Sequence, residues 1–407
     1  MSETLCTAVG IDVSKGKSTI AVMRPFGEIV IPPFEVVHTS DNLKELSETL
    51  RSIDGDLRII MEYTGRYYQP IALYLYDSGF YVSVIHPKLI HDFANNSIRR
   101  VKTDKADAIR IANYGLSNWT TLSPYSREDE LRLLLKTYNR QRNQYLKQLT
   151  AATNNLIALM NQTLPGINVF FTSPRRHDGH IKWIDVAARF WHCEYIKGFS
   201  QKRFVETYNN WCVKNGYRAN SGKAEALYRL AANAIPSMPQ NDYTKRVIRQ
   251  TAQSVQNISE SIMSLCREMG NIARQLPEYP VVISLSGVGD TLAPQLMAEI
   301  GDVRRFPKRS NLIAFAGVDA PPFQSGIYES HKRHISKRGS GDLRKALFLI
   351  VRGIYERSEI NNPVYSFVAQ KKSEGKPYYV CMIAGCNKFL RIYYARVKQY
   401  LNTLETV

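Results

Sequence analysis

Residues 7–23 read TAVGIDVSKGKSTIAVM, two runs of β-branched and apolar residues separated by the polar segment SKGK. Runs of this kind, bounded by Gly and polar residues, are typical of β-strands, so we expect strands at 7–13 and 18–23. Asp12 closes the first strand among apolar neighbours. Burying a carboxylate is costly unless it is paired or bound to a metal ion. Asp12 is therefore a candidate functional residue.

The same alternation of short strands and helical periods continues to about residue 116, which predicts a mixed α/β domain over residues 1–120. The further expected strands are 27–36, 57–62 and 81–85, and the expected helices are 41–51, 67–78 and 103–116. Three strands come first, and strand–helix alternation follows. This order matches a ribonuclease-H-like sheet.

The chain has 407 residues, enough for two or three domains, and its 54 Lys plus Arg against 36 Asp plus Glu give a net charge of +18. Such an excess favours nucleic acid as the partner, although charge alone also fits a basic protein without a specific site. The six cysteines form no C-x-x-C pair, which favours a reducing, cytoplasmic setting. No apolar run reaches the roughly 18 residues that span a bilayer, so we expect no membrane insertion.

Residues 126–162 contain neither Gly nor Pro and repeat apolar residues at helical spacing, as does the segment 242–276. We expect two long helices that form either an antiparallel hairpin or a dimeric coiled coil. Together they define a domain at 126–280 with a small helical insertion at about 165–240. The histidines of the insertion do not have the spacing of a metal site.

After the insertion and the second long helix, the pattern predicts a mainly helical C-terminal domain over 281–407. Its final segment, 377–401, alternates apolar and basic residues and predicts one or two closing helices. Near its start, LSGVGDTLAPQLMAEIG (285–301) resembles the Gly-x-Gly turn of helix–hairpin–helix proteins, which present backbone N–H groups to phosphate. A simple tight turn before a helix explains this stretch equally well.

Three further carboxylates accompany Asp12 in settings of the same kind. Glu62 ends the strand in RIIMEYTG, and Asp104 and Asp107 share one helix face in KTDKADAIRIA. Mg²⁺ prefers a few carboxylates with positions left for water and phosphate oxygens, so these four acids are candidate Mg²⁺ ligands. The alternatives are strand-end acids that cap loops and a helix-start acid pair behind Thr103 as the N-cap. Nearby basic residues give the stretch a phosphate-attracting face: Arg99, Arg100, Lys102 and Lys105.

A serine lies in the second half of the chain, in FAGVDAPPFQSG followed by HKRHISKRGSGDLRK. Ser325 is next to Gly, so a bulky phosphate can approach it, and neighbouring cations would stabilise a charged transition state. The pattern fits a nucleophile, and it also fits a polar loop with a phosphate-positioning basic patch. The basic residues expected to bind nucleic acid are Lys332, Arg333, Lys337, Arg338, Arg344 and Lys345.

Taken together, GIDVSK, MEYTG, VKTDKADAIRIA, QSG and ISKRG resemble the DEDD transposases of the IS110 insertion-sequence family, which are related to the Piv (Piv/MooV) DNA invertases. The resemblance covers about 1–160 and 245–400 and does not extend to the insertion. The family usually continues SKRGN, whereas Ser340 replaces the Asn here. Ser336 and Ser340 are lesser nucleophile candidates.

The resemblance implies a RuvC-like first domain whose Asp12, Glu62, Asp104 and Asp107 bind Mg²⁺, and a C-terminal transposase domain in which Ser325 is the nucleophile. It implies a recombinase that cuts and rejoins donor and target DNA through a covalent serine–DNA intermediate. It also implies a homodimer or homotetramer and a structured guide RNA, the bridge RNA, that pairs with the DNA. Because the acids and the serine are far apart in the sequence, a site composed between protomers is expected.

Three other functions are weighed against this one. A RuvC-like metal-dependent nuclease of the junction resolvase type would use the four acids and leave Ser325 incidental. An actin-like sugar kinase fits the GIDVSKGKSTIAVM stretch, but no second phosphate loop of that fold is present and the basic excess stays unexplained. A non-catalytic nucleic-acid scaffold would retain its activity when Asp104 and Asp107 are neutralised.

Overall fold

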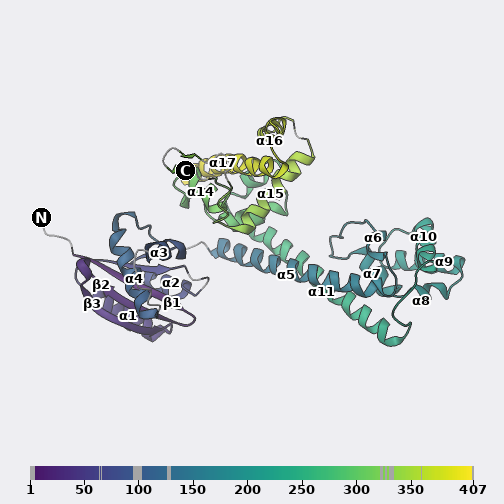
Figure 1. Cartoon of the computed structure of the whole chain (residues 1–407), viewed down its shortest axis with the longest axis horizontal. Helices are drawn as coiled ribbons and strands as arrows, with labels where there is room; N and C mark the ends of the chain where they lie inside the picture. The colour runs from purple at the N-terminus through teal and green to yellow at the C-terminus, as the bar shows by residue number, and fades with distance from the viewer. Residues whose placement is uncertain are drawn as a thin grey trace. The chain divides into compact units, whose positions relative to one another are not determined.

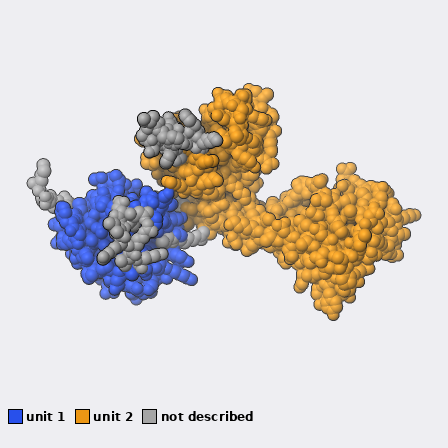
Figure 2. All heavy atoms as spheres, in the orientation of Figure 1, with its two compact units in different colours: residues 1–128 blue, residues 129–407 orange. Residues whose placement is uncertain are grey.

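The computed structural model of the chain describes residues 5–63, 65, 67–94, 103–125, 130–320, 324–325, 328–329, 334–358 and 360–405. The chain forms two compact units, residues 1–128 and residues 129–407, which Figure 2 colours separately. Each unit buries its own hydrophobic clusters. The division into three domains at residues 120 and 280 stays a prediction.

A five-stranded sheet with the order β3-β2-β1-β4-β5 forms the centre of the first unit. The strands are β1 (Cys6–Ser14), β2 (Lys17–Met23), β3 (Ile29–Val37), β4 (Asp56–Glu62) and β5 (Tyr81–Ile85). The first three strands pair antiparallel, and β4 and β5 continue from β1 in parallel. The predicted α/β sheet is confirmed, with three antiparallel strands followed by strands that alternate with helices.

Side chains alternate between the two faces of each strand, and helices cover both faces (Figure 1). On one face, Ile11 and Met61 pack against leucines of α1 and the apolar side of α2. On the other face, Ala8 and Ile60 pack against α4 and against Ile90 of α3. The helices of this unit are α1 (Ser40–Arg51), α2 (Gln69–Asp77), α3 (Pro87–Ala94) and α4 (Asp104–Ser117), with 3-10 turns η1 (Pro25–Gly27) and η2 (Trp119–Thr121). The sequence did not predict α3.

Two long helices, α5 (Glu130–Asn161) and α11 (Asp242–Arg274), begin the second unit and confirm the helices expected at 126–162 and 242–276. They pack antiparallel within one chain, because Leu135 shares a core with Met269 while Leu156 shares another with Ile248. The two helices form a stem between two helical bodies of the same unit (Figure 1). The expected coiled-coil packing stays a prediction.

The insertion forms a helical body at one end of the stem, around a buried aromatic cluster that includes Phe190, Phe204 and Tyr208. Its helices are α6 (Ile167–Phe170), α7 (Lys182–Arg189), α8 (Cys193–Lys197), α9 (Gln201–Lys214) and α10 (Ser221–Ala232). His180 bonds to Asp185 at 2.7 Å, and His192 accepts from the amide of Glu194 at the start of α8. These two histidines hold the local structure.

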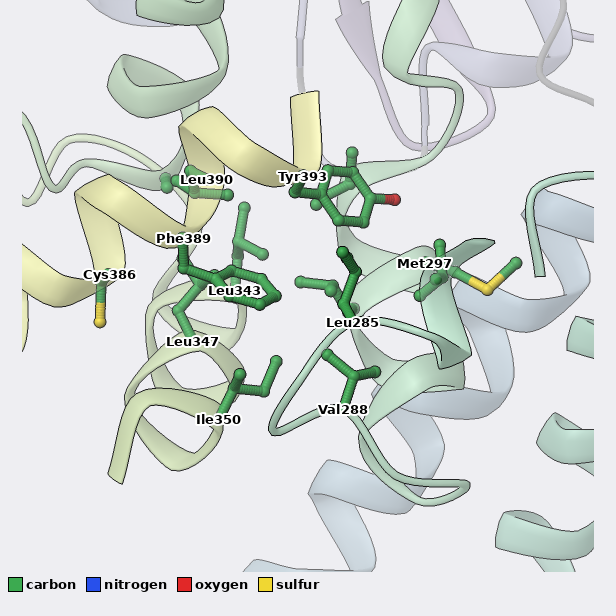
Figure 3. Close-up of a cluster of buried hydrophobic side chains, with 14 of the residues drawn as sticks. Leu285, Val288, Met297, Leu343, Leu347, Ile350, Cys386, Phe389, Leu390 and Tyr393 are labelled. Carbon is green, nitrogen blue, oxygen red and sulfur yellow. The ribbon is translucent and has the colours of Figure 1, made fainter. Parts of the chain in front are cut away.

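The C-terminal body packs α12, α13, α15 and α17 around one apolar core. Figure 3 shows Phe389 and Leu390 of α17 beside Leu343 and Leu347 of α15, with Leu285 close by. The elements are α12 (Tyr279–Ile283), α13 (Leu292–Ile300), η3 (Val303–Arg305), α14 (Arg309–Ala316), β6 (Gln324–Ser325), β7 (Tyr328–Glu329), α15 (Gly341–Glu356), α16 (Pro363–Ser373) and α17 (Tyr378–Glu405). A single closing helix therefore covers the segment predicted at 377–401.

A buried ion pair fastens the stem to this body. The guanidinium of Arg132 on α5 donates to both carboxylate oxygens of Glu278, at 2.8 and 2.7 Å, and both side chains are more than nine-tenths buried. An isolated charge at such a depth would be very costly, so each residue needs the other. In the part of the chain that the structure describes, no helix is both long enough and apolar enough to cross a membrane.

Candidate active site

Asp12 and Glu62 lie at the same end of two neighbouring parallel strands. The register of β1 with β4 runs to Ile11 opposite Met61, so the two acids occupy the next position on each strand. Alternation places them on the face of Ala8 and Ile60, opposite the face that buries Ile11 and Met61. Both acids therefore face the side of the sheet that α4 covers.

Helix α4 lies directly on the strands because two positions there carry no side chain. A Cβ on Gly10 of β1 would lie 2.1 Å from the carbonyl oxygen of Ala108, and a Cβ on Gly115 would lie 2.4 Å from Cδ1 of Ile60. Any larger residue at Gly10 would push the helix away. A glycine inside a predicted strand is a known sign of close backbone approach, so this signal was available in the sequence.

The first turn of α4 carries Asp104 and Asp107. Thr103 is the N-cap, and its hydroxyl oxygen accepts a hydrogen bond from the amide of Ala106 at 3.2 Å, as predicted. Acids in the first turn are stabilised by the helix dipole, which also offsets part of their mutual repulsion. Asp104 is exposed and Asp107 is half-buried.

The four acids act on one another electrostatically. Burial, Asp107, Asp104 and Glu62, in that order, raise the pKa of Asp12 to about 6. Burial and Asp107 also raise the pKa of Glu62, while His86 and His91 oppose this rise. Carboxylates that share a site without a compensating cation have raised pKa values for this reason. The structure therefore brings the four predicted acids into one electrostatic cluster.

The chemistry of this donor set fits a hard divalent cation, which prefers carboxylate oxygens. Among the described residues, however, no three His, Cys, Asp or Glu side chains are close enough together to hold a metal ion. The guanidinium of Arg110 contacts the carboxylate of Asp107 on the same helix. A cationic side chain thus pairs with one of the four acids in this arrangement.

Other residues at this end of the sheet differ in how they were found. Lys105, predicted to attract phosphate, is exposed in the first turn of α4, whereas Arg99, Arg100 and Lys102 lie outside the described residues. The sequence analysis missed His86 and His91. Their signal was only their position just after the strand at 81–85, next to the strand that carries Glu62.

Ser325 belongs to the second unit. Its backbone lies in β6, where it pairs antiparallel with Tyr328 of β7. The two predicted cations that follow, Lys332 and Arg333, lie outside the described residues. The acids and the serine are therefore carried by different units of the chain.

The ISKRG segment packs closely against the end of α14. A Cβ on Gly339 would lie 1.9 Å from the carbonyl oxygen of Phe315, so only glycine fits there. Arg344 donates through Nη1 to the carbonyls of Ala316 and Gly339, both at 3.0 Å, and so holds this loop. Lys337, Arg338 and Lys345, in contrast, are exposed to solvent.

The lesser serine candidates have structural partners. Ser336 donates to a carboxylate oxygen of Asp319, and its amide donates to the carbonyl of the same residue at 2.8 Å. Ser340 is the N-cap of α15, where its hydroxyl oxygen accepts from the amide of Leu343 at 3.1 Å. Asn and Ser are comparably good N-caps, which explains physically why Ser can replace the Asn of the family pattern.

A buried carboxylate that the sequence analysis missed organises the start of α15. Glu299 of α13 accepts hydrogen bonds from Asn139 (2.8 Å) and Arg140 (2.9 Å) of α5 and from Ser340 (2.8 Å). Its side chain is almost completely buried. This network ties the stem to the basic loop that follows the serine segment. Its signal was a single acid in the otherwise apolar helix LAPQLMAEI.

Two transposase families match the chain. The DEDD transposase family of IS110 matches residues 9–165, and the transposase family IS116/IS110/IS902 matches residues 279–364. The first match contains all four acids, and the second contains Ser325 and the ISKRG segment. Both lie within the stretches for which the sequence analysis stated a resemblance.

Relatives of similar length align with most of the chain. The pilin gene-inverting protein of Moraxella bovis is 24% identical over 352 residues, which cover 84% of this chain and 80% of that protein. An insertion element IS110 protein of 43.6 kDa from Streptomyces coelicolor is 20% identical over 397 residues, which cover 98% of this chain and 95% of that protein.

Among solved structures, that of Thermus thermophilus RuvC resembles 29% of this chain and 99% of the RuvC chain, with 12% identity and a TM-score of 0.23. RuvC from the same organism in complex with a Holliday junction substrate gives the same TM-score at 11% identity.

Proposed function

The chain belongs to the IS110 family of insertion-sequence transposases, and from this premise we propose that it cuts and rejoins DNA through a covalent serine–DNA intermediate. As a transposase it is an enzyme that acts on DNA. The observation that carries the proposal is the electrostatic cluster of Asp12, Glu62, Asp104 and Asp107, in a chain that also carries Ser325 beside a basic loop.

In the proposed step, the hydroxyl oxygen of Ser325 forms a bond to a backbone phosphorus as it loses its proton. The bond from phosphorus to one sugar oxygen breaks, and that oxygen leaves as a hydroxyl after taking up a proton. The phosphodiester energy is kept in the serine–phosphate bond, so rejoining needs no ATP. A sugar hydroxyl of the new partner strand reverses the step and releases Ser325.

Two sets of side chains assist. Asp12, Glu62, Asp104 and Asp107 would hold a divalent cation, Mg²⁺ in our proposal, which supplies charge stabilisation at phosphate oxygens. The exposed cations Lys337, Arg338 and Lys345 would hold phosphates near Ser325. The packing of Gly339 and the bond from Ser340 to Glu299 position that loop.

The partners in this proposal are donor DNA, target DNA and a structured guide RNA that selects the sequence by base pairing. The net charge of +18 supports contact with a long polyanion. Because the acids and the serine belong to different units, we propose a site composed between the protomers of a homodimer or homotetramer, acting in the cytoplasm of a prokaryote. The gene-inverting activity named for the Moraxella relative supports rejoining in addition to cutting.

The test is a covalent trapping experiment with the full chain. A labelled DNA that carries the joined ends of the element would be incubated with the wild type, Ser325→Ala, Asp104→Asn/Asp107→Asn and the control Ser261→Ala, in which an exposed stem serine is removed. We expect a protein–DNA adduct, stable in denaturing gels, with the wild type and the control only.

Two outcomes would contradict the proposal. Full adduct formation by Ser325→Ala would exclude this serine as the nucleophile. DNA cleavage by Ser325→Ala without any adduct, lost in the acid variant, would favour the rival RuvC-like nuclease in which the serine is incidental.

A further inference from the structure

Helix α17 has two faces of different character. Its inner face carries Cys386, Phe389, Leu390 and Tyr393, all buried in the core shown in Figure 3. Its outer face carries Tyr379, half-buried Lys388 and exposed Arg391 and Arg396. Because the inner face is occupied by the core, the outer face is free to contact another molecule.

Two adjoining pockets follow this outer face, with volumes of about 660 and 430 Å³. They share Lys388 and Arg391, and we call them together the α17 groove. The first pocket is also lined by Phe367 of α16 and by Tyr379 and Val380 of α17. The second continues along the helix to Arg396.

The groove is lined by basic residues from four parts of the C-terminal body. They are Arg309, His334, Lys337, Lys388, Arg391 and Arg396. Among the described residues, no Asp or Glu lines either pocket, and none of the five Lys and Arg residues forms an ion pair. Uncompensated cations along one groove attract a polyanion, and phosphates at regular spacing match them.

The first pocket also offers aromatic and apolar surface. Tyr379 is 72% exposed, and its ring stacks on Phe348 with centroids 6.1 Å apart. Lys388 lies 6.0 Å from the centre of the Phe367 ring. Exposed aromatic rings stack on nucleic-acid bases only where those bases are unpaired. The combination of an aromatic pocket with a continuous row of cations therefore fits a single strand better than a duplex.

The groove is next to the segment that carries Ser325. Ala320 and His334, which flank residues 321–333, both line the first pocket. A strand held by Lys388 and Arg391 therefore runs past both ends of the serine segment. The position of the groove gives a single strand there a direct route to the nucleophile.

We propose that the α17 groove binds an unpaired stretch of nucleic acid, with a base stacked on Tyr379 and phosphates held by Lys388 and Arg391. Unpaired DNA and unpaired RNA share this chemistry. The assignment of the bound strand to the DNA that Ser325 attacks rests on the proposed function, whereas binding itself does not. No part of the predicted basic cluster at 332–345 other than Lys337 contributes to the groove.

The test measures binding of fluorescent 12-nucleotide oligo-dT, oligo-rU and a 12-base-pair duplex to the full chain by anisotropy at several salt concentrations. Lys388→Ala/Arg391→Ala should weaken binding of the single strands about tenfold or more and make its salt dependence shallower by about one unit of slope. The control Lys202→Ala/Lys214→Ala removes two exposed cations of α9, and so the same net charge, and should leave single-strand binding nearly unchanged.

A second readout tests stacking separately from charge. Tyr379→Ala should weaken single-strand binding about 5- to 100-fold, and Tyr379→Phe should restore it, because stacking needs the ring alone. A 2-aminopurine base in the oligonucleotide should lose fluorescence when it binds the wild type and Tyr379→Phe, but not Tyr379→Ala. Circular dichroism melting would verify that each variant is folded.

Each outcome decides. Stronger binding of oligo-dT than of oligo-rU identifies DNA as the strand, and the reverse identifies RNA. Equal binding by the groove variants and the wild type would overturn the proposal, as would equal losses in the groove and control variants. Single-strand binding with no serine adduct would leave the groove standing while the proposed function fails, and an adduct formed normally by groove variants that bind oligonucleotides normally would do the opposite.

Discussion

The two units of the molecule arrange charge in opposite ways. In the first unit, four acids from two strands and one helix start meet at one end of a sheet, so strongly that burial and repulsion raise the pKa of Asp12 to about 6. In the second unit, cations follow one face of α17 with no acid among the described residues that line the groove. The comparison indicates that a site for a small cation needs convergence, whereas a site for a polymer needs repetition.

The convergent site should be the more fragile of the two. Asp104→Asn/Asp107→Asn should lower the rate of strand exchange about 1000-fold or more, because the loss of metal-ion assistance removes several kcal/mol of transition-state stabilisation. Single-strand binding by the second unit should be unchanged. Strand exchange assays and anisotropy on the same protein would check both, and a variant that retains more than a tenth of its activity would contradict the assignment.

The buried pair that fastens the stem should matter to the second unit alone. Glu278→Gln leaves the guanidinium of Arg132 without its carboxylate at a buried position, which should cost about 3 kcal/mol of unfolding free energy. Hydrogen exchange should become faster in α5 and α12 and stay unchanged in the sheet of the first unit. Faster exchange in the sheet would show that the two units do not unfold separately.

The packing beneath the acid cluster should depend on one glycine more than on another. In Gly10→Ala the new methyl group would meet the backbone of α4, so we expect a loss of about 2 kcal/mol. Gly115→Ala meets only the end of the Ile60 side chain, which can move, so its cost should be smaller. Urea unfolding of both variants measures the difference, and equal costs would mean that α4 is not held at Gly10.

The smallest expected effect is a gain. In EDTA, the raised pKa of Asp12 means that the folded state keeps this proton to a higher pH than the unfolded state, whose pKa is about 4. Stability should therefore fall as the pH rises from about 4 to about 6. Asp12→Asn should remove that fall and gain about 1 kcal/mol at pH 7, once solvent screening at this half-buried site is allowed for. Melting curves at pH 4 and pH 7 would test the sign.

Much of the first unit follows from local patterns. YVSVI predicted β5 with its bounds, because its alternation ends at Pro87 and begins after Gly79. Asp12 and Glu62 were found because charged residues at the ends of apolar strands are costly without a purpose. The helix at Pro87–Ala94 was missed, since it places only one residue, Ile90, in the core.

What local patterns did not contain is the contact between distant segments. The alternation of apolar and basic residues in 377–401 predicted a helix, but only the core around Leu343 and Leu347 decides which face of α17 remains outside. The pairing of Glu299 with Asn139, Arg140 and Ser340 joins residues about 160 and 41 positions apart. No periodicity records such partners, because they depend on how α5 and α13 pack.

The stem also sets a spacing. Leu135 and Leu156 are the most deeply buried α5 residues of the two clusters at its ends, and a rise of 1.5 Å per residue separates them by about 32 Å. One turn of duplex DNA is about 34 Å long. The two bodies joined by the stem are therefore in phase with the double helix. A duplex lying along the stem would present the same groove to both of them, and footprints about ten base pairs apart would be its signature.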